Sequence, residues 1–196
     1  HPGSLENLFD KDYFVYANVP YRIKSYEEIL KNPKDTIVFD HESDKNTREK
    51  CDKNGADGAL SGSSLNEIHH VNFIEKILAV VLAKVSNFIP EAGIWMNTQR
   101  PEWNDANNAL VGNGVSMVTL YYLRRFLTFL KKIVSDSQTE QIQISSELSK
   151  CFLAIADTLE KFKPLLSGKI NDEDRKSLMD GLGKAGSDFR NSIYDV

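Results

Sequence analysis

The residues best suited to chemistry are concentrated in one short segment, residues 100–114, which reads R-P-E-W-N-D-A-N-N-A-L-V-G-N-G. It contains the carboxylates of Glu102 and Asp105, the indole of Trp103 and several asparagine amides, and the apolar run V-S-M-V-T-L-Y-Y-L follows it directly. A plain loop of this length would be richer in Ser, Lys and Pro. The composition therefore leaves two interpretations, a structural junction at the start of a helix or the floor of a binding site.

The first interpretation is a helix N-terminus. Asn104 or Asp105 would then be the N-cap, Trp103 would pack against the helix, and Gly112 and Gly114 would relieve a tight bend. A capping carboxylate accepts hydrogen bonds from backbone amides, which lower its pKa, whereas a general acid needs a raised pKa. The two interpretations therefore predict opposite pKa shifts for Asp105.

The second interpretation is a carbohydrate site. A sugar ring is bound by an aromatic platform against its apolar face and by amide and carboxylate side chains that hydrogen-bond to its hydroxyl groups. Side chains of these types are Trp95, Asn97, Gln99, Trp103, Asn104, Asn107 and Asn108. Cleavage of a glycosidic bond needs a carboxylic acid that protonates the leaving oxygen. A tryptophan packed against Asp105 would raise the pKa of that carboxyl by desolvation.

Residues 99–123 of the 196-residue chain resemble the catalytic-acid segment of the cellobiose phosphorylase family and related (α/α)6-barrel glycosidases. In that family a G-D-W-N-D-G-x-N…G motif precedes a G-E-S-V-W-L helix start. The family's W-N-D matches Trp103, Asn104 and Asp105, and its later Asn and Gly match Asn108 and Gly112. The segment G-V-S at 114–116 echoes the helix start. Where the family has Gly-Asp this chain has Pro-Glu, and alanine 106 replaces a glycine.

The resemblance implies a glycoside hydrolase or phosphorylase-like enzyme that inverts the anomeric centre, with Asp105 as the general acid and Trp103 as the sugar platform. The residues expected to bind an oligosaccharide substrate are Trp103, Glu102, Asn104, Arg100, Gln99, Asn108 and Trp95. In phosphorolysis, inorganic phosphate is the nucleophile. In hydrolysis, a base must lie about 6.5–9.5 Å from Asp105. Because Glu102 would lie only about 5–6 Å away on one helical face, we expect that base elsewhere.

Apolar residues at helical spacing predict four long helices after residue 62. The first begins at the capping box S-L-N-E of 64–67 and ends at Pro90, and the second begins near Gly114. The third covers 139–163, and the fourth follows an acidic cap at 171–174. The spacing predicts an all-α, or at least mainly α, fold built from helical hairpins. A complete (α/α)6 toroid needs twelve helices, so the resemblance implies that this chain is about a third of a larger catalytic domain.

Each of these helices carries an apolar stripe that we expect to be buried. In the second helix the stripe comprises Val115, Val118, Tyr122, Phe126, Phe129 and Leu130. In the third it comprises Ile144, Leu148, Phe152, Ile155, Leu159 and Phe162, and in the fourth Leu178, Leu182, Phe189 and Ile193.

Residues 1–62 are predicted to form an irregular segment that precedes the helical-hairpin region of 63–196. Short extended pieces are expected at 13–17 and 36–40, and a short helix capped by Ser25 should end before Pro33. Residues 41–62 are polar, charged and glycine-bearing, which predicts one long loop.

Composition excludes several other classes of function. The net charge of −4 argues against a nucleic-acid-binding surface, and no apolar run of about 18 residues is available to span a membrane. The segment D-K-N-G-A-D-G at 52–58 fails the calcium-loop pattern, since alanine replaces an oxygen ligand. His69 and His70 diverge by about 100° on a helix and cannot chelate one ion. We therefore expect no metal and no cofactor.

The chain has two cysteines, Cys51 and Cys151, in a charged segment and on a helix face. Two free thiols fit this placement, with a disulfide as the alternative, and free thiols favour a cytoplasmic location. The chain begins with H-P-G-S and lacks a signal-like leader, so we expect it to be an excised piece of a longer protein.

A second class of function is a non-catalytic helical module that binds a glycan or a protein partner. The apolar stripes of the helices would then be partly exposed, and exposed apolar patches usually mark interaction surfaces. A piece of a larger barrel would expose similar patches. Both cases predict that the isolated chain self-associates, or that a tight bundle covers these stripes with residues 41–62 folded over it.

Overall fold

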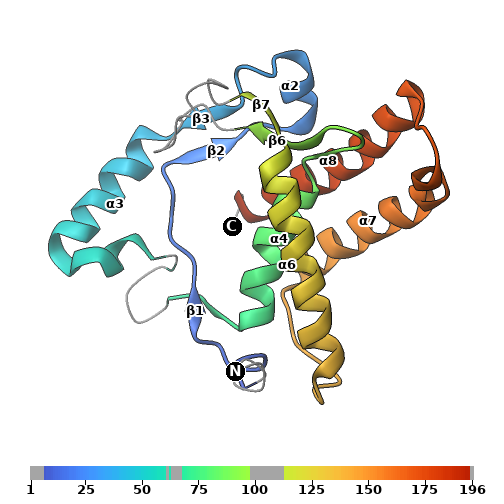
Figure 1. Cartoon of the computed structure of the whole chain (residues 1–196). Helices are drawn as coiled ribbons and strands as arrows, with labels where there is room; N and C mark the ends of the chain where they lie inside the picture. The colour runs from blue at the N-terminus through green and yellow to red at the C-terminus, as the bar shows by residue number, and fades with distance from the viewer. Residues whose placement is uncertain (1–6, 61, 63–67, 98–112, 195–196) are drawn as a thin grey trace.

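The computed structural model describes residues 7–60, 62, 68–97 and 113–194 (Figure 1). Most of these residues are helical, and short antiparallel strand pairs join the helices. The prediction of a mainly α protein is therefore confirmed. None of the helices in these ranges is long and apolar enough to cross a membrane.

The elements follow one another with short connections, except where residues lie outside the described ranges. The N-terminal half contains β1 (Phe14–Val15), β2 (Tyr21–Ile23), α2 (Tyr26–Lys31), β3 (Ile37–Phe39), α3 (His41–Asn54), the 3-10 helix η1 (Gly55–Ala59), β4 (His70–Val71) and α4 (Phe73–Val85). The C-terminal half contains β5 (Phe88–Ile89), β6 (Gly93–Asn97), β7 (Asn113–Ser116), α6 (Met117–Asp136), α7 (Ser146–Phe162), the 3-10 helix η3 (Lys163–Ser167) and α8 (Asp172–Tyr194).

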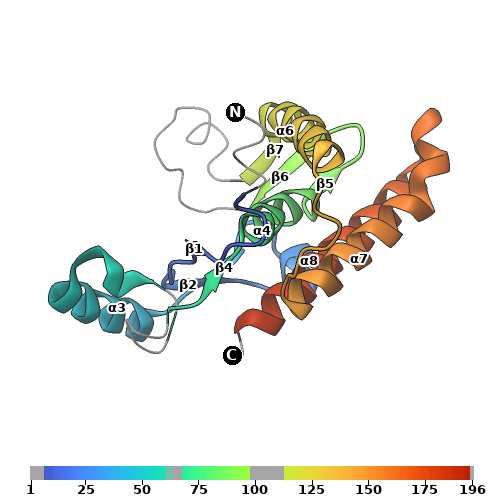
Figure 2. The same ribbon diagram turned by 90° about the horizontal axis from the view of Figure 1, so that it is seen from below.

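The main core lies between α4, α7 and α8. Helices α7 and α8 form a hairpin that lies to one side of the molecule, and α4 packs against both of them (Figures 1 and 2). The buried residues of this core are Leu82, Leu148, Cys151, Ile155, Phe162, Leu178, Leu182 and Ala185. The predicted stripes of the last two helices therefore do form a buried interface.

For two residues in the stripes of the last two helices, the prediction that they are buried is wrong. Phe152 is 43 % exposed and Ile193 is 46 % exposed, because they lie at the edge and the end of the hairpin. Helix α7 also begins at Ser146 and not at 139, since residues 137–145 are extended or irregular. Within the hairpin, Gly181 permits close packing, because a Cβ there would lie 2.7 Å from Cγ2 of Thr158.

A three-stranded antiparallel sheet, β5–β6–β7, lies next to α6 (Figure 2). Trp95 pairs with Val115, and Asn97 pairs with Asn113. Residues Gly93–Asn97 therefore form a strand, which was not predicted from the sequence. A hydrogen bond from the Trp95 amide to the Asn87 carbonyl, 2.8 Å long, adds to the pairing of β6 with β5.

Helix α6 begins later than the sequence indicates and buries less. Residues 113–116 form β7, and Ser116 caps the helix by accepting a hydrogen bond from the Thr119 amide at 3.1 Å. Val118, Tyr122 and Phe129, which were expected to be inside, are 64 %, 66 % and 50 % exposed. Among the described residues of α6 only Ile133 is buried, and it packs with Phe9 and Ile74 in a second, smaller core cluster.

Helix α4 begins at Phe73. The prediction of a helix from residue 64 is therefore wrong over residues 68–72, the described residues that precede this start. The strand pair of β4 with β1 takes up His70 and Val71 instead. Asn72 is the N-cap, and its side-chain oxygen accepts a hydrogen bond from the Glu75 amide at 2.9 Å. The proposed capping box at 64–67 lies outside the described residues.

The prediction of a loop over residues 41–62 is wrong for most of its length, since α3 and η1 occupy 41–59. Asp40 caps α3 through the Ser43 amide at 2.9 Å, and Arg48 bonds to Asp44 one turn away. The helix has no buried residue, so it has no apolar stripe that sequence periodicity could detect. Gly58 lets η1 return onto α3, since a Cβ there would lie 2.4 Å from the Lys50 carbonyl carbon.

The shorter N-terminal predictions are confirmed. Strands β1 and β3 fall within the expected extended pieces at 13–17 and 36–40. Ser25 and Glu28 form a capping box at the start of α2, and Asn32 ends the helix before Pro33.

Candidate functional site

The segment with the W-N-D motif joins two neighbouring strands. Asn97 and Asn113 form the last described pair between β6 and β7, and residues 98–112 connect them in the sequence. Seven of the candidate substrate-binding or catalytic residues lie in that segment and outside the described residues: Gln99, Arg100, Glu102, Trp103, Asn104, Asp105 and Asn108.

The start of α6 changes the structural interpretation of this segment. Ser116 is the N-cap of α6, and β7 separates that cap from Asn104 and Asp105. Neither residue therefore caps α6. The first interpretation of the sequence, in which Asn104 or Asp105 is the N-cap of the helix that follows, is wrong for α6. The reason is that residues 113–116 pair with β6 before the chain turns into the helix.

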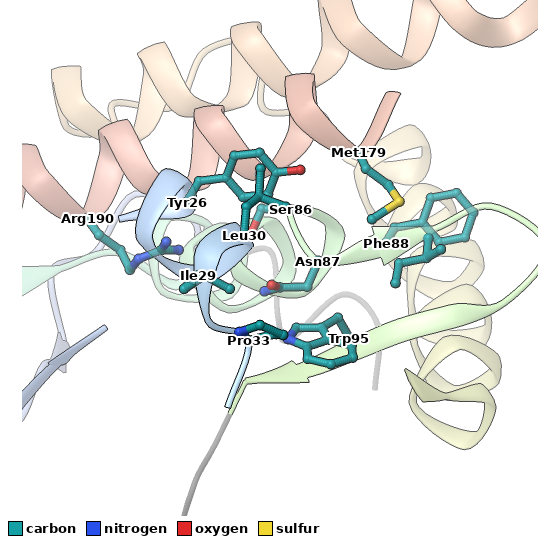
Figure 3. A pocket seen from close by; sticks show the side chains of 12 residues that line it. Tyr26, Ile29, Leu30, Pro33, Ser86, Asn87, Phe88, Trp95, Met179 and Arg190 are labelled. Atoms are coloured by element: carbon teal, nitrogen blue, oxygen red, sulfur yellow. The ribbon is translucent and has the colours of Figure 1, made fainter. Parts of the chain in front are cut away.

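Trp95 is the one candidate site residue whose surroundings the structure describes. Its side chain comes from β6 and lines a pocket that α2, α8 and the segment after α4 also border (Figure 3). The indole Nε1 is buried and has no hydrogen-bond partner among the described residues. A buried donor without a partner costs about 1–3 kcal/mol, so its position calls for an explanation.

This pocket has a volume of about 310 Å³. Its lining residues are Tyr26, Ile29, Leu30, Pro33, Ser86, Asn87, Phe88, Ile89, Trp95, Met179, Gly183 and Arg190. Most of them present carbon atoms, and small-molecule sites of about 300–1,000 Å³ usually have such walls with few polar groups.

Two glycines of α8 allow the walls of the pocket to approach one another. A Cβ at Gly183 would lie 2.3 Å from Cε2 of Tyr26, and a Cβ at Gly186 would lie 2.6 Å from Cβ of Ser86. Both distances are far below ordinary van der Waals contact. Larger residues at these positions would push α2 and the end of α4 away from α8.

Helix α2 is fixed on α8 by two hydrogen bonds from Tyr26. Its hydroxyl donates to Oδ1 of Asp180 at 2.8 Å, and its amide donates to Oγ of Ser187 at 3.1 Å. Burial, followed by the hydrogen bond and the negative charge of Asp180, raises the pKa of Tyr26 far above its ordinary value. The phenol therefore stays protonated and keeps its role as donor.

Arg190 is the charged group of the pocket. Its Nε is buried without a hydrogen-bond partner among the described residues, and no ion pair to its guanidinium occurs there either. Burial lowers the pKa of Arg190, and the nearby Tyr194 and Cys151 oppose that shift. A guanidinium stays protonated even so, so a cation that has no ion pair with the described residues lines this pocket.

The other polar side chains of the pocket are engaged within the protein. Ser86 Oγ and Asn87 Nδ2 both donate to the Ala83 carbonyl, at 3.0 and 2.8 Å. The Tyr26 hydroxyl is held by Asp180. The buried donors of the described pocket that have no partner are thus those of Trp95 and Arg190.

A second group of polar side chains, near β1, makes its contacts within the protein. Lys76 Nζ lies 4.0 Å from the centre of the Tyr16 ring and donates to the Val15 carbonyl at 2.5 Å, while Glu75 accepts the Ser145 amide at 3.0 Å. Burial lowers the pKa of Lys76, and burial together with Glu75 raises that of Tyr16 to about 12. These contacts tie β1 and the start of α7 to α4, which is a structural role.

Within the described ranges, no group of three His, Cys, Asp or Glu side chains could hold a metal ion. Both cysteines are free thiols. No protein-family model matches the chain, and no curated protein sequence matches it.

Sequence reasoning found Trp95 but missed its pocket. Met179, Gly183, Gly186 and Arg190 follow one another at spacings of four, three and four residues, which places them on one face of α8. This face lies beside the apolar stripe and could have been recognised as a second, glycine-bearing contact face. Its partners in α2 and after α4 could not be inferred from periodicity.

Proposed function

We propose that the chain is part of a carbohydrate-active enzyme, an inverting glycoside hydrolase or a phosphorylase-like enzyme, in which Asp105 protonates the leaving glycosidic oxygen. The observation that carries the proposal is the resemblance of residues 99–123 to the catalytic-acid segment of the cellobiose phosphorylase family. The structure adds one supporting feature. The motif connects two hydrogen-bonded strands, and binding and catalytic residues are commonly found on loops that a rigid scaffold positions.

For this chemistry the segment has to supply one acid and a set of sugar-binding groups. Asp105 donates its proton to the leaving oxygen while the nucleophile attacks from the opposite face of the sugar. The nucleophile is phosphate in phosphorolysis, or water activated by a base outside residues 98–112 in hydrolysis. Trp103 stacks on the sugar ring, and the neighbouring amides hydrogen-bond to hydroxyl groups.

The architecture proposed for the parent is an (α/α)6 toroid. In this proposal the α7–α8 hairpin, whose two helices share a buried core, would be one of its repeating units, and further hairpins would come from the rest of a longer protein. The sheet β5–β6–β7 would then be an insertion that presents the motif. This arrangement also gives a reason for the exposed face of α6, which neighbouring hairpins would cover.

The test is the rate of glycoside hydrolysis and phosphorolysis by the full-length parent with Asp105→Asn. Loss of a general acid lowers the rate by about 10²–10⁴-fold. Glu102→Gln is the matched control, because it removes the other carboxylate of the segment and should change mainly the KM. An unchanged kcat in Asp105→Asn, or an equal loss in Glu102→Gln, would refute the assignment.

A second candidate function is a non-catalytic helical module that binds a glycan or a protein partner. The specific observation in its favour is the apolar surface of α6, where Met117, Val118, Tyr121, Tyr122 and Phe129 are all at least 43 % exposed. Such patches usually mark interaction surfaces. Glycan-array binding that survives Asp105→Asn, without turnover by the parent, would favour this candidate over the enzyme.

A further inference from the structure

We propose that the pocket between α2, α8 and the β5–β6 hairpin binds a small organic carboxylate with an apolar body. The carboxylate would pair with the Arg190 guanidinium, and the body would lie against the apolar wall that includes Trp95 (Figure 3). The residues that carry this proposal all lie in the described part of the chain, and the proposal does not rest on the role of Asp105.

The first argument is that Arg190 has no ion-pair partner among the described residues. Arg190 reaches the pocket from the last turns of α8, and its Nε is buried without a partner among the described residues. A buried N–H of a charged group that has no partner costs free energy, so proteins pair such groups or use them to bind ligands. Arg is also the side chain best suited to a carboxylate, because its planar fork donates two parallel hydrogen bonds.

The second argument is the composition of the walls. Ile29, Leu30 and Pro33 come from α2 and the turn after it, while Phe88 and Met179 lie across the pocket (Figure 3). No acidic side chain lines the pocket, so nothing among its lining residues would repel an anion. These walls suit an alkyl or aromatic body.

The third argument separates this ligand from a sugar. A sugar needs a hydrogen-bond partner for most of its hydroxyl groups, but Tyr26, Ser86 and the Asn87 amide nitrogen already bond within the protein. The open donors are then the Arg190 guanidinium, the Trp95 indole N–H and the second N–H of the Asn87 amide. That set fits a carboxylate with one or two further acceptors, fewer than a sugar ring presents.

The size of the pocket fits a small molecule. About 310 Å³ is at the lower end of the range for small-molecule sites. A medium-chain monocarboxylate such as octanoate therefore serves as the probe. Its uncharged counterpart, octanol, has the same chain without the carboxylate.

The experiment is isothermal titration calorimetry of the chain with octanoate, octanol and inorganic phosphate. We expect octanoate to bind at least about tenfold more tightly than octanol, from the strength of a charge-assisted pair. Phosphate should not bind, since it has no apolar body. Equal affinity for octanoate and octanol, or no binding of octanoate, would overturn the proposal.

Arg190→Gln should weaken octanoate binding at least about tenfold and leave octanol unchanged. The matched control is Arg124→Gln, which removes an exposed cation of α6 that does not line the pocket. If circular dichroism shows that Arg190→Gln does not fold, Leu30→Trp serves instead. Leu30 is 49 % exposed, so the larger side chain can be accommodated at the rim while it narrows the pocket. Octanoate affinity that neither folded variant changes would contradict the site.

Discussion

Gly183 offers a direct test of how α2 docks on α8, because two opposite effects act on one substitution. In a solvent-exposed helix interior, Gly→Ala stabilises by about 0.8–1 kcal/mol. Here the added Cβ would lie 2.3 Å from Cε2 of Tyr26. Carbon atoms in contact are normally about 3.5–4.0 Å apart, so the ring would have to move by more than about 1 Å.

The ring cannot move freely. The Tyr26 hydroxyl donates a hydrogen bond to Asp180, and the backbone amide of Tyr26 donates one to Ser187. Overpacking of this kind costs about 1–3 kcal/mol, and a strained hydrogen bond to the carboxylate adds to that cost. After subtraction of the helix-propensity gain, we expect Gly183→Ala to destabilise the chain by about 1–2 kcal/mol. For a chain of this size that lowers Tm by roughly 2–8 °C.

Urea unfolding followed by circular dichroism measures this change. The control Lys184→Ala lies next to Gly183 on the exposed side of α8 and should shift the free energy of unfolding by less than about 0.5 kcal/mol. In a Tyr26→Ala background the clash is gone, so Gly183→Ala should become neutral or stabilising. Stabilisation by about 1 kcal/mol in the wild-type background would show that the Tyr26 ring does not pack on Gly183.

Three further predictions concern other parts of the fold. Ser116→Ala removes the N-cap of α6 and should lower the free energy of unfolding by about 0.5–2 kcal/mol in a urea titration; no loss would place the helix start elsewhere. Val118→Asp, at an exposed site, should cost less than about 0.5 kcal/mol, whereas Ile133→Asp buries a charge and should cost more than about 3 kcal/mol; similar costs would refute the observed face of α6. Burial raises the pKa of the Cys151 thiol, so a thiol reagent at pH 8 should label the more exposed Cys51 first; equal labelling rates would contradict the buried position.

The sequence predicted the helices that have one apolar stripe facing the core. In α8, Leu178 and Leu182 repeat at helical spacing and are almost completely buried. Local capping chemistry was equally informative, since Ser25 and Glu28 mark the start of α2 as expected. These signals depend on near neighbours in the chain, which a single sequence contains.

The failures have physical reasons of two kinds. Helix α3 is stabilised by its Asp40 cap and by pairs such as Arg48–Asp44, so apolar periodicity cannot reveal it. Strands β6 and β7 depend on pairing between residues separated by the segment 98–112, such as Trp95 with Val115. Non-local pairing is not visible in a window of neighbouring residues, and β7 was therefore assigned to the helix that follows it.

The pocket shows the same limit for the candidate site. Trp95 was selected for its aromatic ring, and the structure places it in the same pocket as Arg190, which comes from the other end of the chain. Neither residue type alone indicates a site. Their juxtaposition depends on Gly183 and Gly186, which let α2 and the end of α4 approach α8.

The most direct test of the proposed general acid is the dependence of the rate on the leaving group. The full-length parent and its Asp105→Asn variant would be assayed on aryl glycosides whose phenols differ in pKa. A good leaving group needs no protonation, so the variant should approach the wild-type rate with the most acidic phenol. With the least acidic phenol its rate should be about 10²–10⁴-fold lower. A loss that is the same for every phenol would contradict the role of Asp105 as the general acid.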